Sequence, residues 1–302
     1  MGYLGGMNTQ DQWERLASST DQSVNHVMPL GPKESLECRY VSRPNKPGTV
    51  SLYLSTQTAC SRGCKFCHLT TTGQTVSRNA TLEELREQAQ RVLKEAEGNP
   101  QIHTVNWNFM ARGEPLDVLN GDILGMLRRE TSWTASRTGR WVDCRFKVST
   151  ILPRQVIREG AGEVFERLGG MAVELYWSAY NPDPAWRMAW MPSAGYFGDC
   201  VEFLEEWQRV SACRVRMHGP WIAGENDAQP TVDGLAEAAL RLRADWNTVR
   251  FNPDGTTDQA ESRGWLACHT RLADALDQGN LRAKVIDRVG YDVQASCGMF
   301  VS

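Results

Sequence analysis

The stretch Cys60-Ser-Arg-Gly-Cys64-Lys-Phe-Cys67, followed directly by His68, decides how the rest of this 302-residue chain is interpreted. Its spacing places three thiols on one short loop. Three thiolates can hold three corners of a cuboidal iron–sulfur cluster and leave the fourth iron without a protein ligand. An iron left open in this way can bind an external group. The loop therefore predicts a 4Fe–4S cluster on Cys60, Cys64 and Cys67 that works together with a second ligand.

Zinc and disulfides are the alternative uses of these cysteines. Together with His68 they could form a closed Cys₃His zinc site, which would make the protein a zinc-stabilised binding module. Structural zinc sites usually pair two short Cys/His motifs, and the sequence contains no second one. Disulfides need an oxidising compartment, and the N-terminal sequence has no apolar run of signal-peptide length. We expect the cluster, with zinc as the alternative.

Composition limits the class of protein. With 41% hydrophobic residues the chain can bury one sizeable core. No apolar run approaches the roughly 18 residues of a membrane span, so we expect a cytoplasmic protein without a membrane partner. The net charge is −3 and basic tracts are lacking, which disfavours a long nucleic acid as partner.

Strand and helix patterns alternate along most of the chain. A capping box of Thr81 and Glu84 begins the clearest helix. Repeated strand–helix units imply a parallel sheet with right-handed crossovers, so we predict an α/β fold, an incomplete (β/α)₆ TIM-like barrel. Residues 1–48 would be a short N-terminal extension with a small strand at 37–41, and residues 49–302 the partial barrel, including the loop around Cys297. The expected barrel strands are 49–55, 102–109, 143–150, 173–179, 213–219 and 248–252.

Polar or small residues follow several of these strands, where the active site of such a barrel is built. Gly113 would let a ligand approach the backbone, and Glu114 could receive an ammonium group. Ser149 and Ser178 offer hydroxyls, and Asn252 offers an amide beside a proline-fixed turn. Each could also be an ordinary strand-end residue. Their shared position predicts one site.

The cysteine spacing, with the aromatic Phe66 before the last cysteine, resembles the radical S-adenosylmethionine (SAM) superfamily. Within it, residues from about 36 to 299 resemble the RlmN/Cfr-type enzymes, which methylate carbon-2 or carbon-8 of adenine in RNA. The similar segments are Glu37-x-x-Tyr40-Val41, Cys60–Cys67 with Arg78-Asn-Ala-Thr81, Arg112-Gly-Glu-Pro-Leu116, Val148-Ser-Thr150, Ser178-Ala-Tyr180, Asn252-Pro253 and Ala295-Ser-Cys-Gly298.

This resemblance implies a function for each matching residue. The cluster and SAM would be the cofactors, and an electron donor such as flavodoxin or ferredoxin would be a partner. Cys297 would be the catalytic residue that accepts a methyl from one SAM before a radical from a second SAM activates it. Glu37 would be a general base. The residues implied to contact SAM are Phe66, Gly113, Glu114, Ser149, Ser178, Ala179, Tyr180 and Asn252.

The chain departs from the family in three places. The family has a second essential cysteine where this chain has Tyr53, and a phenol cannot exchange disulfides. Cys38 and Cys213 are candidates to replace it. Only about 35 residues precede the matching region, where the family carries an RNA-binding accessory domain. Tyr180 stands in place of a family histidine and is followed by several tryptophans, which would be core residues or a stacking wall for a flat substrate.

We therefore expect a radical SAM enzyme that transfers a methyl through Cys297 to an sp² carbon of a nucleobase-like or heteroaromatic substrate. This substrate would be smaller than folded RNA, with RNA adenine methylation, as in the family, as one alternative. Another alternative is a non-methylating isomerase, epimerase or cyclase in which Cys297 donates a hydrogen atom. That reaction needs no second thiol and so suits Tyr53.

Overall fold

The computed structural model describes residues 12–140, 142–296 and 298–301. Its strands form a single sheet whose spatial order equals the order in the chain. Strands β1 to β4 pair antiparallel, and β4 to β10 pair parallel. The strands are β1 (Glu14–Ala17), β2 (Val24–Gly31), β3 (Glu34–Ser42), β4 (Thr49–Leu54), β5 (Thr104–Phe109), β6 (Asp143–Thr150), β7 (Val173–Ser178), β8 (Val215–Gly219), β9 (Asp245–Val249) and β10 (Ala283–Ile286).

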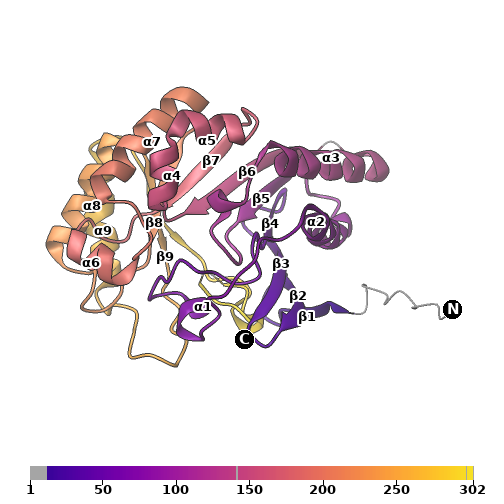
Figure 1. The fold of residues 1–302 in the computed structure, drawn as a ribbon, viewed down its shortest axis with the longest axis horizontal. Helices are drawn as coiled ribbons and strands as arrows, with labels where there is room; N and C mark the ends of the chain where they lie inside the picture. The colour runs from indigo at the N-terminus through magenta and orange to yellow at the C-terminus, as the bar shows by residue number, and fades with distance from the viewer. Residues whose placement is uncertain (1–11, 141, 297, 302) are drawn as a thin grey trace.

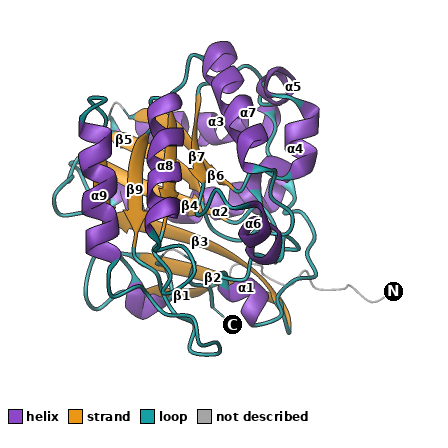
Figure 2. Cartoon of the chain, turned by 90° about the vertical axis from the view of Figure 1, so that its left-hand side faces the viewer, coloured by secondary structure: helices purple, strands orange, loops and turns teal. Residues whose placement is uncertain are grey.

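Helices cover the outside of the parallel part of this curved sheet (Figures 1 and 2). They bury the apolar outer residues of the strands, such as Trp107, whose indole nitrogen donates to the Thr131 hydroxyl at 3.0 Å. The helices are α1 (His68–Thr71), α2 (Leu82–Glu97), α3 (Gly121–Thr138), α4 (Arg154–Glu159), α5 (Ala161–Arg167), α6 (Pro184–Trp190), α7 (Phe197–Ser211), α8 (Gln229–Arg241) and α9 (Trp265–Asp277).

The predicted α/β fold with an incomplete TIM-like barrel is confirmed. The sheet ends at β1 and β10, so the barrel is open. The capping box before α2 forms as expected: the Glu84 backbone N–H donates to the Thr81 hydroxyl at 3.1 Å, and the Thr81 N–H donates to the Glu84 carboxylate at 2.8 Å.

Two parts of the sheet differ from the expectation. A seventh parallel strand, β10, follows the six that were expected. The N-terminal extension contains three antiparallel strands in place of one small strand, and they continue the barrel sheet through β4. Strand β2 was not predicted because buried polar side chains, such as those of Asn25 and His26, interrupt its pattern of alternating apolar residues.

The inner face of the sheet is polar. In β5 the apolar residues Val105, Trp107 and Phe109 belong to the core, while the alternate residues Asn106 and Asn108 line a cavity inside the barrel. The interior of a closed TIM barrel is normally filled by branched apolar side chains. This barrel therefore encloses space that a ligand can use.

Candidate functional site

The cysteine loop lies at the carboxyl end of the parallel strands and lines a cavity that we call the cysteine cavity. Cys60, Cys64 and Cys67 all line it. It is also lined by residues that follow or end β5, β6, β7 and β9, which the sequence predicted to share a site. The predicted site residues that line this cavity are Phe66 of the cysteine loop and Gly113, Glu114, Ser149, Ser178, Tyr180 and Asn252.

The three thiols suit a cluster better than a single metal ion. Burial raises the pKa of Cys60 to about 12 and raises that of Cys64 and Cys67, so their thiolates need a positive partner. Within the described residues, no three His, Cys, Asp or Glu side chains converge to hold one ion. His68, the expected fourth zinc ligand, instead has its Nε2 3.0 Å from the Asn252 carbonyl. The soft donors around one cavity fit an iron–sulfur cluster.

Glu114 is a buried carboxylate in need of a cation. Its oxygens accept hydrogen bonds from the backbone N–H groups of Leu116 and Ile151, both at 3.2 Å. Burial raises its pKa to about 7, because these bonds only partly replace the lost water. An ammonium group in the cavity would stabilise the ionised form.

Gly113 makes room for the loop that carries Glu114. Its φ of +98° is unfavourable for residues with a side chain, and an added Cβ would lie 2.7 Å from the Cβ of Gln57. The Gln57 side chain in turn accepts the Glu114 backbone N–H at 3.0 Å. Glycine is therefore required by the close approach of the β5 loop to the segment that leads into the cysteines.

His218 is a functional candidate that the sequence analysis missed. It lies one residue before the end of β8, opposite Ser178, and its Nε2 lies 2.7 Å from the Ser178 hydroxyl and 3.1 Å from that of Ser149. Burial lowers its pKa to about 4, so the imidazole is neutral at pH 7. The signal that could have found it is its place at the end of an expected strand, like the two serines.

Tyr180 and Phe66 form a stacked pair, with ring centroids 4.0 Å apart and planes at 14°. Tyr180 has a φ of +53°, a conformation that non-glycine residues adopt mainly where surrounding structure enforces it. Trp186 and Trp190 stack behind this pair and line neither cavity, so they support the cysteine loop as packing residues. Ala179 does not line the cysteine cavity either: it is buried, and its carbonyl accepts from Arg187 at 2.9 Å.

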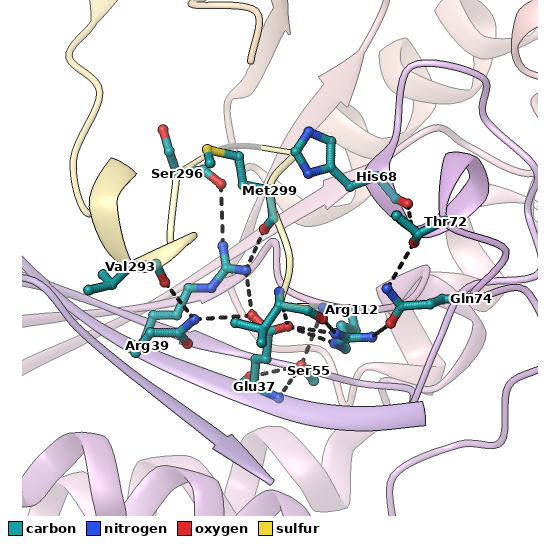
Figure 3. A network of polar contacts seen from close by, with 12 residues as sticks. Glu37, Arg39, Ser55, His68, Thr72, Gln74, Arg112, Val293, Ser296 and Met299 are labelled. Atoms are coloured by element: carbon teal, nitrogen blue, oxygen red, sulfur yellow. Dashed lines mark hydrogen bonds and ion pairs between the residues drawn. The ribbon is translucent and has the colours of Figure 1, made fainter. Parts of the chain in front are cut away.

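Glu37 lies beneath the C-terminal segment, in the buried network that Figure 3 shows. Its carboxylate accepts from Arg112 Nε at 2.9 Å, from Arg39 Nη2 at 2.8 Å and from the Val301 backbone N–H at 3.0 Å. Burial would raise its pKa, but the two arginines outweigh burial and the pKa is lowered. The predicted role as a general base would therefore require one of these ion pairs to break.

The same arginines hold the C-terminal segment next to the cavity. Arg39 donates to the carbonyls of Ser296 at 3.4 Å and Met299 at 2.7 Å, and Arg112 donates to the carbonyl of Val301. Cys297 itself lies outside the described residues. The residues on either side of it, Ser296 and Gly298, line the two cavities of the barrel.

A second cavity of about 420 Å³ occupies the barrel interior, and we call it the lumen. It shares Met110, His218, Val249 and Arg250 with the cysteine cavity, so the two cavities adjoin one another. Tyr53 lines the lumen, at the position where the family has its second cysteine.

Neither Cys38 nor Cys213 lines either cavity, and Cys38 is fully buried in the core. Among the described residues, the cluster cysteines are the only thiols that line these cavities.

Comparison with known proteins gives relatives of one kind. No protein-family model matches the chain. A curated protein of Frankia casuarinae, named "Probable dual-specificity RNA methyltransferase RlmN", is 30% identical over 89% of this chain, which spans 61% of that protein. A protein of the same name from Bacteroides thetaiotaomicron is 26% identical over 93% of this chain and 75% of its own length.

Solved structures share the fold. A radical SAM methyltransferase from Sphaerobacter thermophilus has a TM-score of 0.73 at 20% identity and covers 95% of this chain and 81% of its own. The FeFe-hydrogenase maturase HydG has a TM-score of 0.53 at 11% identity, over 80% of this chain and 52% of its own.

None of the helices in the described residues has the length and the hydrophobicity that a membrane span needs.

Proposed function

We propose, from its similarity to proteins named RlmN, that the chain is a radical SAM C-methyltransferase of the RlmN-like family. The methyl, carried by Cys297, goes to an sp² carbon of a nucleobase-like or heteroaromatic substrate held in the lumen. The observation that carries the proposal is the cysteine cavity. It brings three thiols together with Glu114, from a loop distant in the sequence, at the carboxyl end of the sheet.

Different residues of the cysteine cavity hold different parts of the two cofactors. Cys60, Cys64 and Cys67 hold the 4Fe–4S cluster, which when bound supplies the electron that cleaves SAM to an adenosyl radical. Glu114 binds the SAM ammonium, because a cation relieves the cost of its buried charge. The neutral His218 holds Ser149 and Ser178 in place for hydrogen bonds to SAM.

The methyl-carrying role of Cys297 has indirect support. Ser296 lines the lumen and Gly298 lines the cysteine cavity. Glu37 and the two arginines paired with it, Arg39 and Arg112, hold the C-terminal segment through hydrogen bonds to its backbone. A residue that must meet SAM on one side and substrate on the other suits this border.

The volume of the lumen supports a small substrate. Pockets for small ligands commonly measure about 300–1,000 Å³, and the lumen falls within that range. The relatives named as RNA methyltransferases make RNA the alternative. An external electron donor, such as flavodoxin or ferredoxin, would reduce the cluster.

Reductive cleavage of SAM tests the proposal. Protein reconstituted with iron and sulfide without oxygen should form 5′-deoxyadenosine when SAM and dithionite are added. Glu114→Gln should weaken SAM binding about tenfold or more, since a charge-assisted hydrogen bond is lost. A colourless protein that holds stoichiometric zinc and leaves SAM intact would contradict the proposal and support the binding module.

A non-methylating reaction, in which Cys297 donates a hydrogen atom, is favoured by one observation. The family position for a second thiol is Tyr53, and neither Cys38 nor Cys213 lines a cavity. Methyl-labelled SAM separates the two functions. Label in the product supports methyl transfer, whereas 5′-deoxyadenosine with an unlabelled product supports the isomerase, epimerase or cyclase.

A further inference from the structure

The lumen has polar walls because alternate residues of its strands point inward. Strand pairing aligns Tyr53, Asn108 and Lys147 across β4, β5 and β6. On the other side it aligns His218, Asn247 and Lys284 across β8, β9 and β10. All six line the lumen.

Lysines gather at one part of this cavity. The chain has six lysines, and three of them, Lys46, Lys147 and Lys284, line the lumen. They come from the β3–β4 connection, from β6 and from β10, so the fold brings them together. None of the three forms an ion pair with an acidic side chain of the described residues.

These lysines repel one another and are partly deprived of water. The pKa of Lys147 is lowered to about 8, chiefly by burial and also by Arg216, Lys284 and Lys46, although the nearby Glu174 opposes the shift. The pKa of Lys284 is lowered by burial and by Lys46. A bound anion would remove this repulsion.

Acidic residues near the lysines are mostly committed to other cations. Glu174 and Asp245 both pair with Arg216, at 2.5 and 2.6 Å. The acidic residue that lines the lumen, Asp287, is exposed. The lumen is also lined by Arg43, Arg145 and Arg288, of which Arg145 pairs with Asp143 and Arg288 with Glu261. The cavity as a whole is therefore cationic.

Buried amides lie beside the lysines, because strand pairing sets Asn108 level with Lys147 and Asn247 level with Lys284. Asn106, Asn108 and Asn247 are 3–5% exposed, and their side-chain oxygens have no hydrogen-bond partner among the described residues. A buried acceptor without a partner is destabilising. All three residues line the lumen, and a rotation of their side chains toward it would let a ligand with hydrogen-bond donors satisfy them.

We propose that the lumen binds a small phosphorylated molecule of mononucleotide size. Its phosphate lies on Lys46, Lys147 and Lys284, and its ring extends past Asn108 and Asn247 toward His218, which lines both cavities. As the identity of a substrate, this inference rests on the proposed function. Lys147 is two residues before Ser149 on β6, about 7 Å along the strand. A sugar-sized spacer covers this distance, so the ring of such a molecule reaches the border with the cysteine cavity.

Binding of inorganic pyrophosphate and of AMP, measured by calorimetry on the full chain with its cluster reconstituted, tests this inference. Lys147→Gln and Lys284→Gln should each weaken pyrophosphate binding about tenfold or more, because a charge-assisted contact is worth about 1.5–3 kcal/mol. Lys94→Gln, on the outer helix α2, is the matched control and should bind like the native protein. Asn108→Ala should weaken binding of AMP but not of pyrophosphate.

Pyrophosphate binding that is absent, or unchanged in both lumen variants, would overturn the inference. Lys284 is exposed, so its variant keeps the test valid even if Lys147→Gln folds poorly. Single-stranded RNA that binds through the same lysines, without competition from AMP, would overturn the small-molecule assignment.

Methylation of Cys297 measured on the same samples separates the two proposals. Methylation without lysine-dependent pyrophosphate binding overturns the lumen site alone. Lysine-dependent binding without SAM cleavage supports the lumen site and contradicts the proposed function.

Discussion

The cysteine cavity and the lumen adjoin one another, yet they are built in different ways. The cysteine cavity is lined largely by loops and strand ends, such as the Cys60–Cys67 loop and the Gly113-Glu114 turn, which carry short recognisable motifs. The lumen is lined largely by alternate residues within strands, such as Asn106, Asn108 and Lys147, which form no motif. We propose that the cysteine cavity carries out the chemistry general to the family, and we expect the selectivity of this chain to reside in the lumen.

This difference between loop residues and strand residues indicates where a sequence is informative about function. A loop that binds a cofactor must fix the backbone, so it needs particular residues at fixed spacings. A strand offers every second side chain to the interior, and such positions can change singly without disturbing the fold. The predictions below test this division of roles.

Loss of the cluster has the largest expected effect. Cys64→Ser should remove the iron–sulfur absorbance and reduce 5′-deoxyadenosine formation to background, since one of three ligands is lost. Cys213→Ser, which changes a thiol that lines neither cavity, should leave both unchanged. Iron content and product chromatography measure the two quantities. Full activity in Cys64→Ser would place the reactive centre elsewhere.

Removal of the Glu37 charge should destabilise the border between the cavities. Glu37→Gln leaves Arg39 and Arg112 buried without their carboxylate, which typically costs about 3–5 kcal/mol. The exposed pair of Glu205 with Arg241 provides a control, and Glu205→Gln should cost less than about 1 kcal/mol. Urea unfolding gives both values. Hydrogen exchange should also accelerate in residues 298–301 of Glu37→Gln. Equal exchange in both variants would show that Glu37 does not hold the C-terminal segment in place.

His218 lines both cavities and should make stability depend on pH. Its pKa is about 4 in the folded chain, against an ordinary value of 6.5. Between these values the unfolded chain binds a proton that the folded chain does not, so stability should fall as the pH decreases from 6.5 to 4. The full loss attributable to His218 is roughly 3 kcal/mol.

His218→Gln should flatten this part of the curve of unfolding free energy against pH, measured in urea from pH 7.5 to 4.5. A variant of the exposed His103, His103→Gln, serves as the control and should retain the native slope. An equal slope in native protein and His218→Gln would show that the imidazole is not buried in its neutral form.

Gly113→Ala should have the smallest effect on stability and a local effect on SAM. The positive φ and the contact with Gln57 should cost about 1–3 kcal/mol and weaken SAM binding, while pyrophosphate binding in the lumen should persist. Gly198→Ala, in α7 with open space around it, should be neutral or slightly stabilising. Thermal unfolding and calorimetry measure these changes. Loss of pyrophosphate binding in Gly113→Ala would contradict the separation of the two cavities.

The sequence predicts the cysteine cavity well and the lumen poorly. Cys60, Cys64 and Cys67 share a loop, and Glu114 and Asn252 follow strands, so strand order alone brings them together. Lys147 could have been found from the alternation in β6, where Arg145, Lys147 and Ser149 face inward and Phe146 faces the core. Alternation of this kind in a parallel strand indicates that one face is solvated.

The missed strands have a similar physical reason. Strand β2 buries Asn25 and His26, whose side chains contact Glu37 on the next strand and Glu95 on α2. Strand β10 has only four residues and is half-buried, so its pattern is weak. Tertiary contacts, and not local sequence patterns, therefore determine that both segments form strands. The role of Cys297 stays a prediction, because it rests on the resemblance of the segment that carries it.

The mass of the peptide that contains Cys297 tests the central claim most directly, because it needs no knowledge of the substrate. Reconstituted protein is incubated anaerobically with SAM whose methyl carries deuterium, and the digested peptide is measured by mass spectrometry. We predict the gain of one deuterated methyl group on Cys297, and no gain in a Cys60→Ser protein. An unmodified Cys297 in a protein that cleaves SAM and forms a methylated product would contradict the account.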